Sequence, residues 1–262
     1  MGNYLSYAPE PKLKKYGWKP DLPDHRDQKV FFTETQTNNI DLRNKCPDIY
    51  DQGKLGSCTA NAISFAYEFD QMKQKESNPF VPSRLFIYYN ERDRDGSVDS
   101  DSGSTLRSGI KTINKIGVCK SSDWPYDITQ FTVKPPTILY EEAKNHRSIK
   151  YKKVEQRISQ LRMALKSGYP IVFGVSIYES FESLETYNTG IVSMPNIDEK
   201  MMGGHAIALV GFDDKKRHFI FRNSWGKDWG EKGYGYIPFN YVTDPNLAGD
   251  FWIVEQVLDK DN

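Results

Sequence analysis

The sequence over residues 52–60 reads Gln-Gly-Lys-Leu-Gly-Ser-Cys-Thr-Ala, and it leads directly into an apolar pattern of helical period. The apolar positions that follow recur at spacings of three and four residues: Ala62, Phe65, Ala66, Phe69 and Met72. We therefore predict a long helix over residues 59–74, buried on one face, with Cys58 at its start. A helix N-terminus favours negative charge, so this position should lower the pKa of the thiol and suit a nucleophile. The small residues Gly56 and Ser57 should leave the sulfur accessible.

Two stretches of the second half carry side chains that complement a thiol. Residues 203–206 read Gly-Gly-His-Ala, and residues 223–226 read Asn-Ser-Trp-Gly. The imidazole of His205 can take and return a proton, and the carboxamide oxygen of Asn223 can accept the second ring N–H. The indole of Trp225 can shield that hydrogen bond from water. The structural alternatives are a histidine tied to a backbone carbonyl and a simple Asn-Ser turn.

Gln52 lies six residues before Cys58. Its side-chain amide could stabilise an oxyanion together with the backbone N–H of Cys58. With His205 and Asn223, these residues supply a nucleophile, a base, an orienter of the base and an oxyanion donor. That set indicates acyl transfer through a thioester. Taken singly, Cys58 also fits a buried core residue and Gln52 a turn.

Composition narrows the class of protein. The chain has 262 residues, of which 38% are apolar and 27% charged, so it is long enough for one large domain or two lobes with a packed core. The 35 basic and 35 acidic residues balance, and nucleic acid is therefore not expected as a partner. The proposed chemistry needs neither a metal nor an organic cofactor. The sequence does not indicate an oligomeric state.

The N-terminal residues and the cysteines indicate the cellular compartment of the protein. The chain has three cysteines, no Asn-x-Ser/Thr acceptor, no apolar signal region and no run of eighteen apolar residues. These features predict an intracellular or otherwise reducing compartment, although a bridge between Cys46 and Cys119 stays open. Residues 1–6 fit the N-myristoylation pattern at Gly2, and lysines follow, so one acyl chain with a basic cluster could contact a membrane. The alternative is an ordinary N-terminus.

Three regions follow one another along the chain. Residues 1–38 form an extension rich in Pro, Lys and Asp, without helical periodicity. Residues 39–150 are predicted to be helical and carry the nucleophile, and residues 151–262 are predicted to be rich in strand and carry the base and its orienter. The further predicted elements are helices over 83–92, around 106–113 and over 155–167, and strands over 171–177, 205–212, 218–223, 233–239 and 251–257. We expect the site in a cleft between the two lobes.

From about Ile40 onward the sequence resembles the papain-like cysteine proteases, the cathepsin family. Four tracts carry the resemblance in the right order: residues 52–60, 117–126, 203–211 and 223–236. The resemblance implies an α+β fold of two lobes, a helical left lobe and a β-barrel-like right lobe, with the active site in the cleft. It implies an enzyme that hydrolyses peptide bonds of peptide or protein substrates. The tract over residues 202–207 is most similar to the cathepsin B branch.

The resemblance also assigns residues. It implies Cys58 as nucleophile, His205 as acid and base, Asn223 as orienter and Gln52 as oxyanion donor, with Trp225 as the shield. Six residues are implied in substrate binding. Gly103 and Ser104 would bind the substrate backbone, Thr105, Leu106 and Ala206 would line the main specificity pocket, and Trp225 would border the site.

Several positions depart from the family pattern. Leu55 replaces a disulfide cysteine, Thr59 an aromatic residue, Ser104 a glycine and Gly204 an acidic residue. The chain also lacks the paired histidines of the cathepsin B occluding loop, so we predict an endopeptidase. The long helical propeptide is absent. Residues 1–38 could instead lie in the cleft as a short inhibitory segment, which would make the chain a zymogen, or they could be a disordered tail.

An acidic loop over residues 91–102 precedes Gly103. It only partly matches a calcium-binding loop. We expect it to border the cleft and to favour basic substrate residues.

Two other classes of protein remain open. A related Cys–His acyltransferase of the transglutaminase type would share the thiol and imidazole, although its orienter is usually Asp. A catalytically inactive papain-fold binding protein is the non-enzyme alternative.

Overall fold

The computed structural model describes residues 16–35, 38–76 and 78–259. The N-myristoylation pattern at Gly2 and the lysines that follow it up to residue 15 lie outside the described residues. Membrane contact through them therefore stays a prediction.

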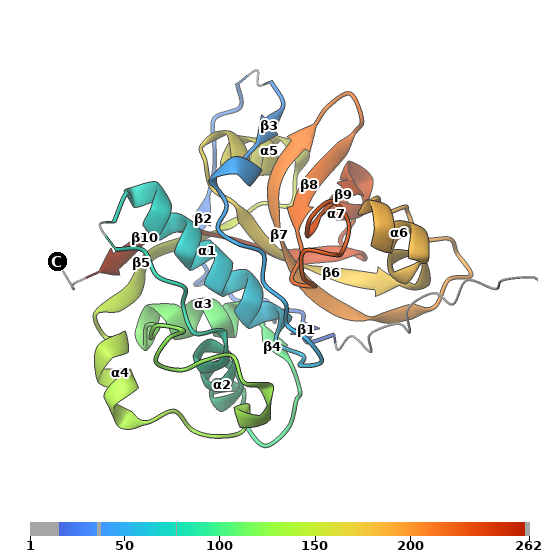
Figure 1. The fold of residues 1–262 in the computed structure, drawn as a ribbon. Coiled ribbons are helices and arrows are strands. Elements are labelled where there is room, and N and C mark those ends of the chain that lie inside the picture. Colours follow the sequence, from blue (N-terminus) through green and yellow to red (C-terminus); the bar gives the residue numbers. More distant parts are fainter. Residues whose placement is uncertain (1–15, 36–37, 77, 260–262) are drawn as a thin grey trace, which may run out of the picture.

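Three helices gather in the lower part of Figure 1: α2 (Arg84–Asp95), α3 (Leu106–Lys115) and α4 (Thr137–Ala143). Helix α1 (Cys58–Gln74) lies above them in Figure 1, at the centre of the molecule. The predicted helices over 59–74, 83–92 and 106–113 are confirmed. At the start of α2, the Ser83 hydroxyl accepts a hydrogen bond from the Phe86 N–H, and Gly96 ends the helix with a positive φ of 69°.

Helix α1 is more buried than its pattern suggested. Every residue from Cys58 to Gln71 is buried, so the prediction of a single buried face is wrong. The helix packs against α2 and α3 on one side and against the strands β7 (Met201–Asp213) and β10 (Ala248–Asp259) on the other. It lies between the two parts of the molecule, which places Cys58 at their junction.

Strands of the second half, together with the short strands β2 and β3 near the N-terminus, form an eight-stranded sheet with the order β2-β5-β10-β6-β7-β8-β9, and β3 pairs with β7. The remaining bounds are β2 (Lys29–Val30), β3 (Ile40–Asp41), β5 (His146–Val154), β6 (Ile171–Tyr178), β8 (His218–Arg222) and β9 (Tyr234–Pro238). All five predicted strands are present, and the predicted helix over 155–167 is α5 (Ile158–Lys166). Three short helices were not predicted: α4, α6 (Leu184–Thr189) and α7 (Phe239–Thr243).

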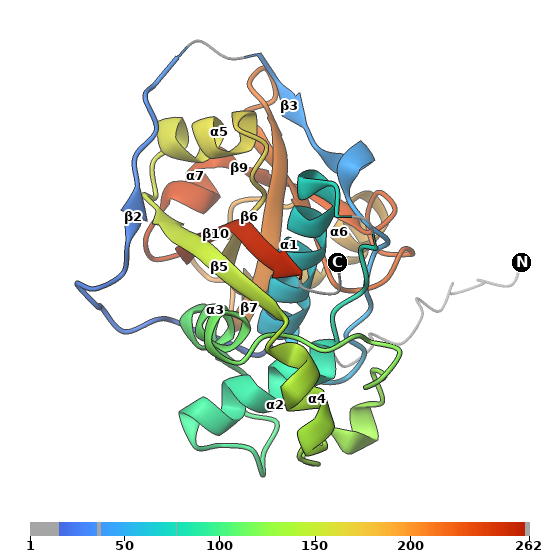
Figure 2. The ribbon, with the colours of Figure 1, turned by 90° about the vertical axis from the view of Figure 1, so that its left-hand side faces the viewer.

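The N-terminal extension lies on the rest of the protein. Strand β1 (Trp18–Lys19) pairs in parallel with β4 (Ser104–Thr105), at the helical side. Strand β2 then pairs in parallel with β5 at the edge of the large sheet, as Figure 2 shows. Residues 16–35 therefore contact both parts of the molecule, and the alternative of a disordered tail is wrong for them.

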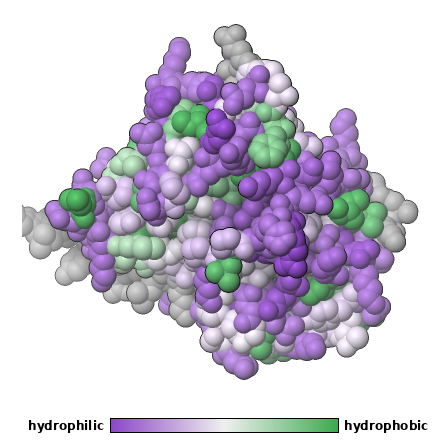
Figure 3. Space-filling view, turned by 180° about the vertical axis from the view of Figure 1, so that it is seen from behind, coloured by the Kyte–Doolittle hydropathy of each residue, from purple (hydrophilic) through white to green (hydrophobic). Residues whose placement is uncertain are grey.

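One face of the molecule is largely polar (Figure 3). On the face that Figure 3 shows, hydrophobic residues form small, separate patches on a hydrophilic background. Within the described ranges, no helix combines the length and the apolar character needed to cross a membrane.

Candidate active site

The turn before α1 is held by hydrogen bonds from several elements. The Gly56 N–H donates to the Asp101 carboxylate at 3.0 Å, and the Ser57 hydroxyl lies 2.5 Å from the Tyr126 hydroxyl. The side chain of Asn61, one turn into the helix, donates to the Ser57 carbonyl at 2.9 Å. These contacts fix where α1 begins and therefore where the thiol of Cys58 lies.

Cys58 is completely buried, which contradicts the expectation of an accessible sulfur. Burial raises the pKa of the thiol to about 11, although hydrogen bonds from the backbone of Ala206 and Gly17 oppose the rise. The predicted lowering of the thiol pKa is therefore wrong for this form of the protein. Gly17 belongs to the N-terminal segment, so that segment helps to exclude water from the thiol.

His205 and Asn223 contact each other next to Ala206, whose backbone hydrogen-bonds the thiol. His205 lies in β7, immediately before Ala206, and Asn223 directly follows β8. The distance from His205 Nε2 to Asn223 Oδ1 is 2.8 Å, and the same oxygen accepts the Ser224 N–H at 2.9 Å. The indole of Trp225 stacks on the imidazole with ring centres 4.7 Å apart. The three side chains that were predicted to act together are therefore in contact and buried.

Gln52 is held by both ends of its carboxamide. Its Nε2 donates to the Leu55 carbonyl at 2.9 Å, and its Oε1 accepts the Ser224 hydroxyl at 2.7 Å. Its backbone N–H donates to the Ser224 carbonyl at 2.9 Å. Ser224 thus joins Gln52 to Asn223, a role that the sequence did not reveal because a serine beside an asparagine reads as a turn.

The expected backbone-binding residues already hold a peptide strand. The Ser104 N–H donates to the Gly17 carbonyl at 2.7 Å. A Cβ atom added to Gly103, whose φ is +67°, would lie 2.0 Å from that same carbonyl oxygen. The Tyr88 hydroxyl accepts the Gly103 N–H at 3.1 Å and donates to Asp101 at 2.6 Å. Tyr88 and Asp101 were not predicted, and they tie this strand to the turn before Cys58.

Trp18 fills the adjoining pocket. Its side chain is only 9% exposed. Cβ atoms added to Gly174 or Gly204 would come within 1.8 Å and 2.9 Å of its ring, so both glycines are needed for this fit. A cavity of about 210 Å³ continues beside Trp18 and is bordered by Met201 and Asp250.

The remaining predicted pocket residues lie nearby in the fold. Thr105 pairs with Lys19 and caps α3 through a hydrogen bond from the Ser108 N–H. Leu106, the first residue of α3, is fully buried. Their contact with a substrate stays a prediction.

Tyr16 completes the cover. Its ring lies 6.3 Å from that of His205 and 6.4 Å from that of Trp225, both in edge-on geometry. Its hydroxyl donates to the Glu182 carboxylate. Residues 16–19 therefore lie across the thiol, the imidazole and the adjoining pocket.

Thr59, which stands where the family has an aromatic residue, has a hydrogen-bond partner in the core. Its hydroxyl donates to the Glu91 carboxyl at 2.8 Å. Burial raises the pKa of Glu91 well above its usual value.

The acidic loop has structural partners. The carboxylate of Asp95 accepts hydrogen bonds from the hydroxyls of Ser104 and Ser108, at 2.6 and 2.7 Å. Asp101 holds Gly56 and Tyr88. Across residues 16–35, 38–76 and 78–259, no group of three or more His, Cys, Asp and Glu residues could hold a metal ion. The preference for basic substrates stays a prediction.

Cys46, Cys58 and Cys119 are all free thiols. The disulfide between Cys46 and Cys119 that the sequence left open is not formed.

Comparisons with known proteins agree with this geometry. Residues 36–248 match the model of the papain family cysteine proteases. A peptidase C1-like protein of Acanthamoeba polyphaga mimivirus is 46% identical, over 94% of this chain and 88% of its own length. Mouse cathepsin K is 28% identical over 78% of this chain, which spans only 60% of that protein.

Proteins of the same family are found among the solved structures that resemble this chain. Xylellain, a cysteine protease from Xylella fastidiosa, superposes with a TM-score of 0.84 at 38% identity, covering 95% of this chain and 98% of its own. A procathepsin L of Tenebrio molitor shares the fold, with a TM-score of 0.66 at 17% identity. The predicted α+β two-lobe fold and cysteine peptidase activity are confirmed. The chain belongs to the papain family of cysteine proteases.

Proposed function

We propose that the chain is a cysteine endopeptidase in which Cys58 attacks the scissile carbonyl, His205 transfers the proton and Asn223 orients His205. One observation carries this assignment: Nε2 of His205 bonds to Asn223 at 2.8 Å while the thiol is hydrogen-bonded by the backbone of Ala206, the next residue in β7. Because Nε2 is engaged, Nδ1 is the ring atom that exchanges the proton with the thiol.

The oxyanion would be stabilised by two donors. The N–H of Cys58 is one of the first four of α1 and has no partner within the helix. The carboxamide of Gln52 is the second donor, and its contacts with Leu55 and Ser224 fix its orientation in advance. Pre-orientation matters because such donors stabilise the transition state without a cost for rearrangement.

After the attack, the protonated imidazole gives its proton to the leaving amine, and a thioester forms between Cys58 and the substrate. Water then enters, His205 removes its proton, and hydrolysis of the thioester regenerates the thiol. The buried stack of Trp225 on His205 keeps water away from the bond to Asn223.

We further propose that the described form is a closed precursor. The segment over residues 16–19 occupies the site. The Gly17 carbonyl oxygen accepts the Ser104 N–H at 2.7 Å, and the Gly17 backbone also hydrogen-bonds the thiol. Activity would require displacement or removal of this segment.

Labelling with an epoxide thiol inhibitor tests the assignment. After the N-terminal segment is displaced, we expect one label per chain by intact mass, which is lost in Cys58→Ala and retained in Cys46→Ala and Cys119→Ala. Cleavage of a peptide blocked at both ends should be lost in Cys58→Ala as well. Labelling that persists in Cys58→Ala would refute the assignment. Labelling without cleavage would favour an inactive scaffold or an acyltransferase.

The free state of all three thiols supports our proposal of a reducing compartment.

A further inference from the structure

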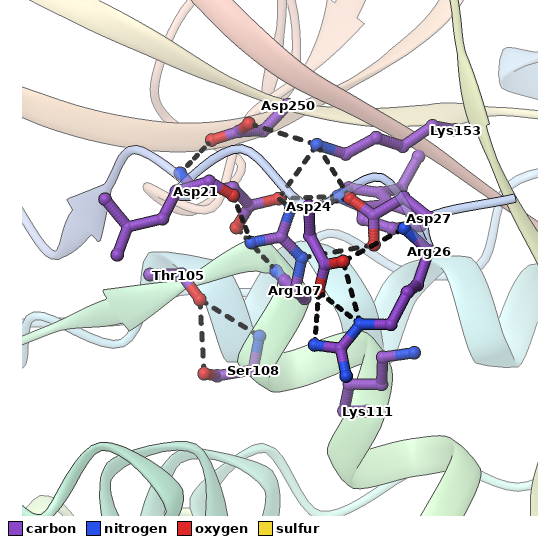
Figure 4. A network of polar contacts seen from close by, with 12 residues as sticks. Asp21, Asp24, Arg26, Asp27, Thr105, Arg107, Ser108, Lys111, Lys153 and Asp250 are labelled. Atoms are coloured by element: carbon purple, nitrogen blue, oxygen red, sulfur yellow. Dashed lines mark hydrogen bonds and ion pairs between the residues drawn. The ribbon is translucent and has the colours of Figure 1, made fainter. Parts of the chain in front are cut away.

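The carboxylate of Asp21 lies in a pocket of hydrogen-bond donors, and its side chain is fully buried. Its Oδ1 accepts the backbone N–H of Arg107 at 2.9 Å, and its Oδ2 accepts the indole N–H of Trp252 at 3.1 Å. The ammonium of Lys153 lies 3.4 Å from Oδ2. Figure 4 shows this network between the N-terminal segment and the strands and helix behind it.

These donors belong to the body of the protein and not to the segment they hold. Arg107 is the second residue of α3, where backbone N–H groups lack partners within the helix and the helix dipole favours an anion. Lys153 lies in β5 and Trp252 in β10, which pair directly with each other at this point. Three elements of the main fold therefore build a site for one carboxylate.

The charge balance of the cluster depends on the segment. In the closed form the carboxylates of Asp21, Asp27 and Asp250 face the cations of Arg107 and Lys153. Asp21 and Asp27 both belong to the segment. When it leaves, Arg107 and Lys153 remain with Asp250 alone, and the cluster changes from an excess of negative charge to an excess of positive charge. The vacated site would then attract an anion.

The site lies within reach of a bound peptide. Asp21 is four residues beyond Gly17, which contacts the thiol. An extended chain covers at most about 14 Å over four residues. A peptide held at Cys58 can therefore place one of its side chains at this site.

We infer that the pocket formed by Arg107, Lys153 and Trp252 is a carboxylate-binding subsite of the protease. In the closed form it anchors the N-terminal segment through Asp21. In the open form it selects substrates that carry an acidic residue three to five positions from the cleaved bond. The second role rests on the proposed peptidase function; the first does not.

The anchoring role is tested on the full chain by the rate at which iodoacetamide alkylates Cys58, which needs no turnover. Asp21→Asn should increase this rate by about tenfold to a hundredfold, the range expected for loss of a hydrogen-bonded buried charge. Asp24→Asn is the matched control, because Asp24 belongs to the same segment and its side chain bonds to Arg26 of that segment. Equal rates for Asp21→Asn and Asp24→Asn would overturn the anchoring role.

The selective role is tested in the Asp21→Asn chain with pairs of peptides that carry Glu or Gln at each position around the bond. We expect Glu to be preferred about tenfold at one position three to five residues from the bond. The preference should be lost in Lys153→Met, with thermal melting as the check of folding, and should shrink at high salt. The same peptide pairs are also compared for how strongly each peptide slows the alkylation of Cys58.

No preference for Glu at any position, in cleavage or in protection, would overturn the subsite. Protection by the Glu peptide without cleavage of either peptide would support the subsite and refute the proposed peptidase function instead.

Discussion

Replacing Trp18 by alanine in the full chain should expose the thiol of Cys58. A tryptophan buries about 150–250 Å² of surface, and Trp18 is only 9% exposed in a pocket bounded by Gly174 and Gly204. At about 25 cal/mol per Å², this burial stabilises the closed form by at most about 4–6 kcal/mol. The open form buries part of the same surface, so we expect a loss of about 3 kcal/mol, the lower end for a Trp→Ala change.

A loss of about 3 kcal/mol raises the population of the open form more than a hundredfold. If alkylation proceeds only through the open form, the second-order rate constant of iodoacetamide with Cys58 should rise by the same factor. The rate is measured by intact mass at pH 7.5, and Cys58→Ala identifies the modified thiol. Phe31→Ala is the control, since Phe31 lies in the same segment but is 69% exposed.

Equal alkylation rates for Trp18→Ala and Phe31→Ala, with both chains still folded by thermal melting, would contradict this expectation. That result would mean that the pocket contact does not hold the segment over the thiol.

Three further predictions concern the site and the core. In the opened Trp18→Ala chain, Gln52→Ala should lower kcat by about a hundredfold to a thousandfold with little change in KM, because it removes one oxyanion donor; an unchanged kcat in peptide hydrolysis would exclude that role. In the same chain, Asn223→Ala should lower kcat/KM about tenfold or more and shift the acid limb of the pH profile of kcat/KM, because the 2.8 Å hydrogen bond to the imidazole is lost. A pH profile with the same shape and height as that of the parent chain would contradict this prediction. The third prediction concerns Asp70 in the core. Burial raises the pKa of Asp70 to about 7, so the folded state binds this proton more tightly than the unfolded chain does. The free energy of unfolding should therefore fall as pH rises from about 4 to about 7. Asp70→Asn should remove this fall, worth at most about 4 kcal/mol, in urea titrations at pH 5 and pH 8; parallel pH dependence in both proteins would show that Asp70 is not the group responsible.

Periodicity and composition predicted the elements that carry an apolar signal of their own. The apolar spacing after Cys58 predicted the helix α1, although not its burial on all sides, and the Val- and Ile-rich run over 171–177 predicted β6. Strand β5 was missed because its sequence, HRSIKYKKV, is mostly polar and its central residues are exposed or half-buried. Its pairing with β10, far along the chain, is what makes it a strand.

The site was predictable to the extent that its residues form local motifs. Cys58, His205, Asn223 and Gln52 each lie in a recognisable tract, and the structure brings them together. For the cover over them, the sequence left two alternatives open, a segment in the cleft or a disordered tail. The pairing that holds the cover was not predictable, because strands of two residues such as β1 carry no periodic signal and depend on a remote partner. The same holds for the carboxylate site, where Asp21 meets Arg107 and Trp252 from distant parts of the chain.

The contacts of Ser224 have a consequence for how this protease can change state. Its backbone and side chain bind Gln52 on the loop before α1, and a bridge between Asp51 and Trp225 lies beside it. The two halves of the molecule are thus joined beside the residues proposed as the oxyanion donor and as the support of the histidine, and a hinge motion that separated the halves would break both contacts at once. We therefore expect activation to displace only the N-terminal segment and to leave the two halves in place.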